Sequence, residues 1–87
     1  MDIITMSKLK ELTNVNIIDI REKAAYNRKH IKDAVNINFN DILINYEKYL
    51  NKNETYYIYC HSGIMSKQLC SILINKGYNT IAVTGRI

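Results

Sequence analysis

The chain has 87 residues, of which 12 are lysine or arginine and 8 are aspartate or glutamate, giving a formal net charge of +4. This length fits one small domain that buries about 60–65% of its unfolded surface. The chain has no apolar stretch near the roughly 20 residues that cross a bilayer, no secretory signal core and only two cysteines, so we expect a cytoplasmic protein with reduced thiols and no membrane contact.

Apolar residues recur in two alternating patterns, short runs typical of buried strands and wider spacings typical of helices. Thr5 can cap the first helix, and Asn38 or Asn40 can cap the third. The predicted elements in chain order are a strand at residues 3–4, a helix from Thr5 through Leu12, a strand at 16–20, a helix at 22–28, a strand at 34–37, a helix at about 41–50, a strand at 55–60, a helix from Met65 to before Gly77, and a strand at 79–83.

Strands separated by helices predict an α/β fold with parallel pairing. The apolar run Tyr56 to Tyr59 is typical of a strand covered on both faces, so we expect a small parallel sheet of about five strands with helices on both faces. The residues expected to turn inward from the helices are Met6 and Leu9, then Ala25 and Tyr26, then Ile42, Tyr46, Tyr49 and Leu50, and finally Met65, Leu69, Cys70, Leu73 and Ile74.

Cys60 ends the strand at 55–60, and a loop containing Gly63 joins it to the last helix. The N–H groups of residues 61–66 can point at this cysteine, with the positive end of a helix dipole behind them. These conditions stabilise a thiolate or an anion bound to its sulfur. A buried cysteine that merely packs is the alternative. The position at the carboxyl end of a strand, where open α/β sheets bind ligands, favours a reactive cysteine.

The loop Cys60-His61-Ser62-Gly63-Ile64-Met65-Ser66 resembles the active-site loop of the rhodanese (sulfurtransferase) family, Cys-x-x-Gly-x-Arg-Ser. Three other segments resemble family signatures in the same order. They are Asp19-Ile20-Arg21-Glu22 for Asp-x-Arg-Glu, His30-Ile31-Lys32-Asp33-Ala34-Val35-Asn36-Ile37 for His-Ile-Pro-Gly-Ala-x-x-Ile, and Gly85-Arg86-Ile87 for Gly-Gly-Ile. The resemblance implies a rhodanese-like three-layer fold for one domain over residues 1–87.

The chain departs from the family pattern at several positions. Met65 replaces the loop Arg, and Arg86 replaces the second terminal Gly. Lys32 and Asp33 replace Pro and Gly, which predicts a differently shaped turn. Family domains commonly continue into a further helix, whereas this sequence stops at Ile87, so we expect a domain truncated at its C-terminal end. Uncovered apolar surface would then predict a weak homodimer or a low melting temperature.

The resemblance implies a sulfurtransferase in which Cys60, the catalytic nucleophile, carries sulfane sulfur as a persulfide. The donor would be thiosulfate or a persulfide, including a protein persulfide, and the acceptor cyanide, a thiol or a partner protein's cysteine. Loop N–H groups would hold the terminal sulfur anion. The substrate-binding residues would be His61, Ser62, Gly63, Ile64, Met65 and Ser66. The resemblance assigns Asp19 and Arg21 to structural support, and the chemistry needs no cofactor or metal.

Two other function classes remain open. A catalytically attenuated rhodanese-like module could bind a partner or sense oxidants through Cys60. The loss of the loop Arg at Met65 and of the second terminal Gly at Arg86 favours it. A cysteine-based phosphatase or arsenate reductase also uses a strand-loop-helix anion cradle, but it relies on an Arg to hold the oxyanion. Nucleic acid is not an expected partner, because the basic residues are mixed with acids. The densest basic group, Arg28, Lys29, His30 and Lys32, is interpreted as a solvated turn.

The remaining thiol and imidazole groups receive smaller roles. Cys70 lies on the predicted apolar face of its helix, so we expect it to pack in the core rather than react. His61 adjoins the nucleophile and could assist its ionisation or guide a substrate, although neighbouring loop side chains often diverge. No zinc site is expected, because the four residues that could bind zinc lack the spacing of metal ligands: His30, Cys60, His61 and Cys70.

Overall fold

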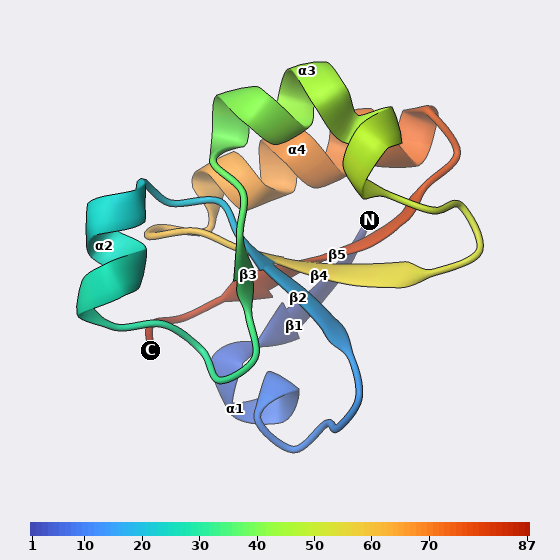
Figure 1. Cartoon of the computed structure of the whole chain (residues 1–87). Helices are drawn as coiled ribbons and strands as arrows, with labels where there is room; N and C mark the ends of the chain where they lie inside the picture. The colour runs from blue at the N-terminus through green and yellow to red at the C-terminus, as the bar shows by residue number, and fades with distance from the viewer.

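The computed structural model describes residues 1–87 and contains one five-stranded sheet, in which every paired strand is parallel (Figure 1). The strand order is β1-β5-β4-β2-β3. The α/β class and the five-stranded parallel sheet predicted from the sequence are confirmed. The elements are β1 (Asp2–Thr5), α1 (Met6–Leu9), β2 (Asn16–Asp19), α2 (Lys23–Arg28), β3 (Val35–Asn36), α3 (Phe39–Tyr49), β4 (Thr55–Tyr59), α4 (Ile64–Asn75) and β5 (Asn79–Thr84).

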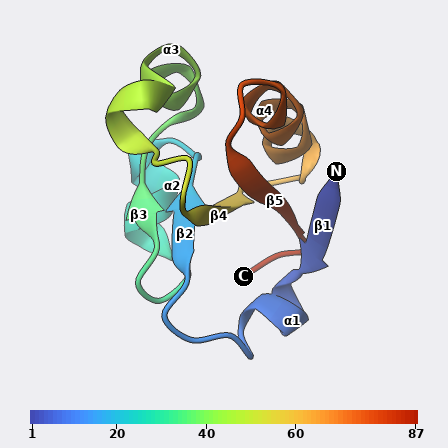
Figure 2. The same ribbon diagram turned by 90° about the vertical axis from the view of Figure 1, so that its right-hand side faces the viewer.

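Helices cover both faces of the sheet, and a separate apolar cluster fills each face. Figure 2 shows α3 and α4 together on one side and α1 on the other. Successive side chains of a strand point to opposite faces, so neighbours in β4 enter different clusters: Ile58 packs beneath α3 and α4, while Tyr59 packs toward α1. Both faces of the central strands are therefore buried, which explains their continuous apolar runs.

The predicted N-cap residues are confirmed for two helices, although α3 starts at Phe39 rather than at about residue 41. The Thr5 hydroxyl accepts the N–H of Lys8 at 3.2 Å at the start of α1, and the Asn38 side chain accepts the N–H of Asp41 at 2.9 Å at the start of α3. The end predicted for the first helix was wrong, because α1 stops at Leu9 rather than Leu12. Leu12, which lies beyond the end of α1, is 40% exposed.

The apolar face predicted for the last helix is correct in its middle and wrong at its ends. Leu69, Cys70 and Leu73 of α4 have no exposed surface, whereas Met65 and Ile74 are each 39% exposed. Ser66 takes the buried position in the first turn instead, because its hydroxyl donates to the Gly63 carbonyl at 3.1 Å. A satisfied hydroxyl can be buried at little cost, and this leaves the neighbouring Met65 to face outward.

The segment between α2 and β3 makes a tight turn through Asp33, whose φ is 67°. This is the left-handed region, where Gly is favoured and Asp is tolerated. Asp33 stands where the resemblance expects Gly. The substitution therefore keeps a left-handed residue in the turn. β3 itself is shorter than predicted, with only Val35 and Asn36 in the ladder.

The parallel arrangement brings the carboxyl ends of β2, β3 and β4 to one edge of the sheet (Figure 1). The segments that follow these strands begin at Ile20, Ile37 and Cys60. Ligand sites in open α/β sheets form at this edge. None of the helices combines the length and the apolar character needed to cross a bilayer.

Candidate functional site

The loop after β4 folds around the sulfur of Cys60. Gly63 adopts φ 82°, a left-handed conformation that suits Gly, and precedes the first residue of α4. This turn directs two backbone N–H groups at the Cys60 Sγ, from Gly63 at 3.2 Å and from Ser66 at 3.3 Å. Both N–H groups lie at the start of a 12-residue helix, where the helix dipole adds positive potential. The sulfur therefore sits in an environment that stabilises negative charge.

The other groups of the predicted loop have separate roles. The Ser62 hydroxyl accepts the N–H of Ile64 at 3.3 Å, and the Ser66 hydroxyl donates to Gly63 rather than pointing at the sulfur. The Ile64 side chain is 62% exposed and points away from the core. The backbone N–H groups of His61 and Met65 donate to no acceptor within the chain. They remain available to a ligand that enters the loop.

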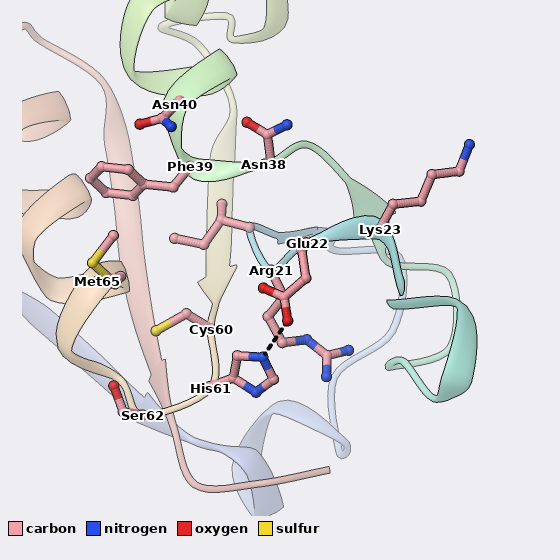
Figure 3. Close-up of a pocket in the computed structure, with 11 residues that line it drawn as sticks. Arg21, Glu22, Lys23, Asn38, Phe39, Asn40, Cys60, His61, Ser62 and Met65 are labelled. Atoms are coloured by element: carbon pink, nitrogen blue, oxygen red, sulfur yellow. Dashed lines mark hydrogen bonds and ion pairs between the residues drawn. The ribbon is translucent and has the colours of Figure 1, made fainter. Parts of the chain in front are cut away.

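The Cys60 loop forms one side of a pocket of about 450 Å³ at the carboxyl edge of the sheet (Figure 3). Cys60 is 4% exposed, so the pocket is the route by which a ligand reaches its sulfur. Figure 3 shows the sulfur directed to the side of Met65, whereas the His61 ring turns toward Glu22. The lining residues are Ile20, Arg21, Glu22, Lys23, Asn38, Phe39, Asn40, Cys60, His61, Ser62 and Met65.

Glu22 and His61 form a solvent-exposed pair at the pocket rim, with 3.2 Å between Glu22 Oε1 and His61 Nε2. The pKa of the Glu22 carboxyl is lowered, first by a hydrogen bond with its own backbone and then by the His61 contact. The pocket therefore contains an ionised carboxylate at neutral pH. Position 65 of the loop, where the rhodanese pattern has Arg, is Met, so it supplies no positive charge to balance Glu22.

Asp19 and Arg21 form a buried ion pair directly beneath the pocket. The Arg21 Nη2 lies 2.7 Å from Asp19 Oδ2 and also donates to the Lys29 carbonyl at 2.6 Å. The hydrogen bond from Asp19 raises the pKa of Arg21 further, so its charge is permanent. The Asn36 amide donates to the carbonyls of both residues at 2.9 Å. These bonds join the ends of β2 and β3 to the end of α2, and they commit the Arg21 guanidinium to internal partners.

The structure brings four of the seven predicted loop residues into the pocket wall, and the other three act through the backbone or face outward. The contributions of Asn38, Phe39 and Asn40 were not predicted. They follow β3, and the rule that strand ends converge at one edge could have indicated them. No group of three or more His, Cys, Asp or Glu side chains is placed to hold a metal ion.

Cys70 has the core position predicted for it. It has no exposed surface and packs with Leu69 and Leu73. Burial raises the pKa of its thiol from 9.0 to about 11. A thiol with this pKa is almost entirely protonated at neutral pH, so it is a poor nucleophile. Of the two cysteines, only Cys60 combines N–H donors at its sulfur with an opening to solvent.

Comparison with known proteins adds independent information. The model of the family described as Rhodanese-like domain matches residues 5–85. The chain is 38% identical over 61 residues to a tRNA sulfurtransferase from Thermoplasma acidophilum, covering 70% of this chain. It is 30% identical over 69 residues to the thiosulfate sulfurtransferase PspE of Escherichia coli, covering 78%. A rhodanese-like domain protein from Staphylococcus aureus superimposes with a TM-score of 0.86 at 31% identity, covering 98% of this chain and 86% of that one.

The lengths of these relatives differ greatly. The matched region is 12% of the Thermoplasma protein and 66% of PspE. The shared part is therefore the domain itself, and the remaining sequence of the larger relative has no counterpart in these 87 residues.

Proposed function

This chain belongs to the rhodanese-like domain family, and we propose that it is a sulfurtransferase that carries sulfane sulfur as a persulfide on Cys60. Two of the relatives described above are named for sulfur transfer, one to tRNA and one from thiosulfate. The observation that carries the proposal is the pair of N–H bonds to the Cys60 sulfur at the start of α4, at the inner end of the pocket.

The reaction has two steps. The Cys60 thiolate attacks the outer sulfur of thiosulfate; a Cys60–S bond to that sulfur forms, the S–S bond of thiosulfate breaks, and sulfite leaves with the electron pair. An acceptor thiolate or cyanide then attacks the outer sulfur of the persulfide, and Cys60 leaves as thiolate. Splitting the transfer in this way is covalent catalysis. The donor in the first step can equally be a protonated persulfide, which leaves as a thiolate.

The loop supports these steps with fixed dipoles. The N–H groups of Gly63 and Ser66 hold the thiolate sulfur. The N–H groups of His61 and Met65, which have no partner in the chain, are available to the outer sulfur once it has been added. Donors that are already oriented need no reorganisation as charge moves between the two sulfur atoms.

Intact-mass measurement after incubation with thiosulfate tests this proposal. We expect the wild-type protein and Cys70→Ser to gain the mass of one sulfur atom that cyanide or a thiol then removes, and Cys60→Ser to gain nothing. Cys70→Ser is the matched control because it removes the other thiol and leaves the loop intact. An unchanged mass in the wild type, with thiosulfate and with an organic persulfide, would contradict the proposal.

One observation favours the attenuated module as the second candidate. The pocket contains the Glu22 carboxylate, while Met65 supplies no charge and the Arg21 guanidinium is committed to Asp19. Lys23 also lines the pocket, but Figure 3 shows its side chain extending away from Cys60. A doubly charged donor is therefore poorly matched to the pocket. If Cys60 forms no persulfide but is oxidised by peroxide to a sulfenic acid that dimedone traps, the redox-sensing function is preferred.

A further inference from the structure

A second, smaller recess of about 220 Å³ adjoins the Cys60 pocket. Arg21 and His61 line both cavities, so the two share a wall. The recess collects side chains from the end of α2, the end of β4 and the segment after β5. Its lining residues are Arg21, Lys29, Tyr59, His61, Arg86 and Ile87.

The side chains that line the recess carry an excess of positive charge. No Asp or Glu side chain lines it. Arg21 is neutralised by Asp19, and His61 contacts Glu22 from the neighbouring pocket. Lys29 and Arg86 are exposed and form no ion pair within 4.0 Å. Two residues with unpaired cationic side chains that line one concave surface are suited to a carboxylate, which can accept hydrogen bonds from both.

Cys60 lines the larger pocket and not the recess, and the two cavities meet at Arg21 and His61. Thiosulfate carries its charge on the group next to its outer sulfur, so it cannot place that charge at a distance from Cys60. An organic persulfide can, because a carbon chain separates its sulfur from its carboxylate. In the Cys60 pocket Glu22 is ionised and Met65 is neutral, and Figure 3 shows the Lys23 side chain extending away from the sulfur, so no free cation lies beside the sulfur to favour an anion there.

Building on the proposed sulfur transfer, we propose that the preferred donor is a small organic persulfide bearing a carboxylate, and that Lys29 and Arg86 bind this carboxylate. In the transfer, the Cys60 thiolate attacks the outer sulfur of the protonated persulfide R–S–SH. A Cys60–S–SH bond forms, the donor's S–S bond breaks, and the electron pair leaves with the R–S⁻ thiolate. The recess contributes binding and orientation, and it takes no part in bond making.

A matched pair of donors tests the inference. Mercaptopropionate persulfide and mercaptopropionamide persulfide differ only in the charge of the terminal group. We expect the wild type to favour the carboxylate donor by about 3- to 10-fold in the rate constant for persulfide formation on Cys60, read by intact mass in single turnovers. The ratio for the double variant Lys29→Gln/Arg86→Gln should fall close to one, and high salt should reduce the wild-type ratio.

The double variant Lys10→Gln/Lys32→Gln is the control, because it also removes two positive charges but from a cavity that neither Lys29 nor Arg86 lines. It should keep the wild-type ratio. Taking the ratio of two donors within each protein cancels any difference in the amount of folded enzyme. A ratio near one in the wild type, or a preference that persists in the double variant, would overturn the inference while leaving the sulfur transfer standing. If neither donor places sulfur on Cys60, the proposed function itself fails.

Discussion

Cys60 and Cys70 belong to the same apolar cluster beneath α3 and α4, and they are 4% and 0% exposed. The surroundings of the two sulfurs differ far more than their burial. Two N–H groups at the start of α4 point at the Cys60 sulfur, which also meets a pocket. The Cys70 sulfur is inside the same helix's apolar face, and burial raises the pKa of its thiol to about 11. The comparison teaches that oriented donors and access, rather than burial alone, separate a reactive cysteine from a packing one.

Exchanging each thiol for a hydroxyl gives the largest expected effect. Cys60→Ser should abolish thiosulfate:cyanide sulfurtransferase activity, because the persulfide has no sulfur on which to form. Cys70→Ser should retain most of it, since Cys70 has no route to the pocket. Steady-state thiocyanate formation measures both. Equal loss in the two variants, with the folded fraction matched by circular dichroism, would instead indicate a dithiol mechanism.

Met65→Arg adds a positive charge to the pocket of Cys60 and leaves the surroundings of Cys70 unchanged. The wild-type KM for thiosulfate should be high, around 1 mM or above. A charge-assisted contact of roughly 1.5–3 kcal/mol would lower it by about 10- to 150-fold. The rate from an uncharged or protein-bound persulfide donor should change less, because only thiosulfate uses the new guanidinium.

Met65→Lys serves as the control for geometry, since it adds the charge without the planar fork of donors. We expect it to lower the KM for thiosulfate less than Met65→Arg does. Alkylation of Cys70 should be the same in all three proteins. An unchanged KM in both variants would mean that the absent loop Arg does not limit thiosulfate binding.

The burial of the Cys70 thiol predicts that the free energy of unfolding depends on pH. The folded pKa of Cys70 is about 11 against an ordinary value of 9.0, so the unfolded chain releases this proton first. The contribution of Cys70 is therefore fully present below pH 9.0 and is lost as the pH rises to about 11. Its size is about 2–3 kcal/mol at most.

Urea unfolding of the wild type and Cys70→Ala at pH values across this window measures the effect. Tyr49 and Tyr78 also have raised pKa values, but they titrate in both proteins and cancel in the difference. The stability advantage of the wild type over Cys70→Ala should shrink with rising pH. A difference that stays constant would show that the burial of Cys70 does not disfavour its thiolate.

The strand-loop-helix unit that creates this contrast could be predicted from the sequence. The apolar run ending at Cys60, the turn residue Gly63 and the spacing of Leu69 and Leu73 are local patterns, and a local pattern determines which side of a helix meets the sheet. The prediction was wrong at the helix start, where Met65 was expected to be buried. Ser66 and Met65 are adjacent there, and only the Ser66 hydrogen bond to the Gly63 carbonyl shows which of them is buried.

The far wall of the pocket could not be predicted from local patterns. Glu22 meets His61 across 39 residues of sequence, because β2 pairs with β4 in the sheet. Phe39 reaches the same pocket because β3 pairs with β2. These contacts follow from strand order, which alternation of helices and strands does not determine. The contact of the Glu22 carboxylate with His61 at the pocket rim was therefore outside what the sequence indicated.

The smallest expected effect concerns His61, the neighbour of Cys60 that could have assisted its ionisation. The His61 ring contacts Glu22 rather than the sulfur, and Figure 3 shows the Cys60 side chain directed the other way. The charge-stabilising groups at the sulfur are backbone N–H groups, which a side-chain substitution leaves in place. His61→Gln should therefore change the rate at which neutral iodoacetamide alkylates Cys60 by less than about twofold, as expected for loss of an exposed pair.

Glu22→Gln is the matched control, because it breaks the same contact from the other side and should give the same small change. A rate that falls tenfold in His61→Gln but not in Glu22→Gln would mean that the imidazole acts on the thiolate directly, and the contrast between the two cysteines would then depend on a side chain as well as on the loop backbone.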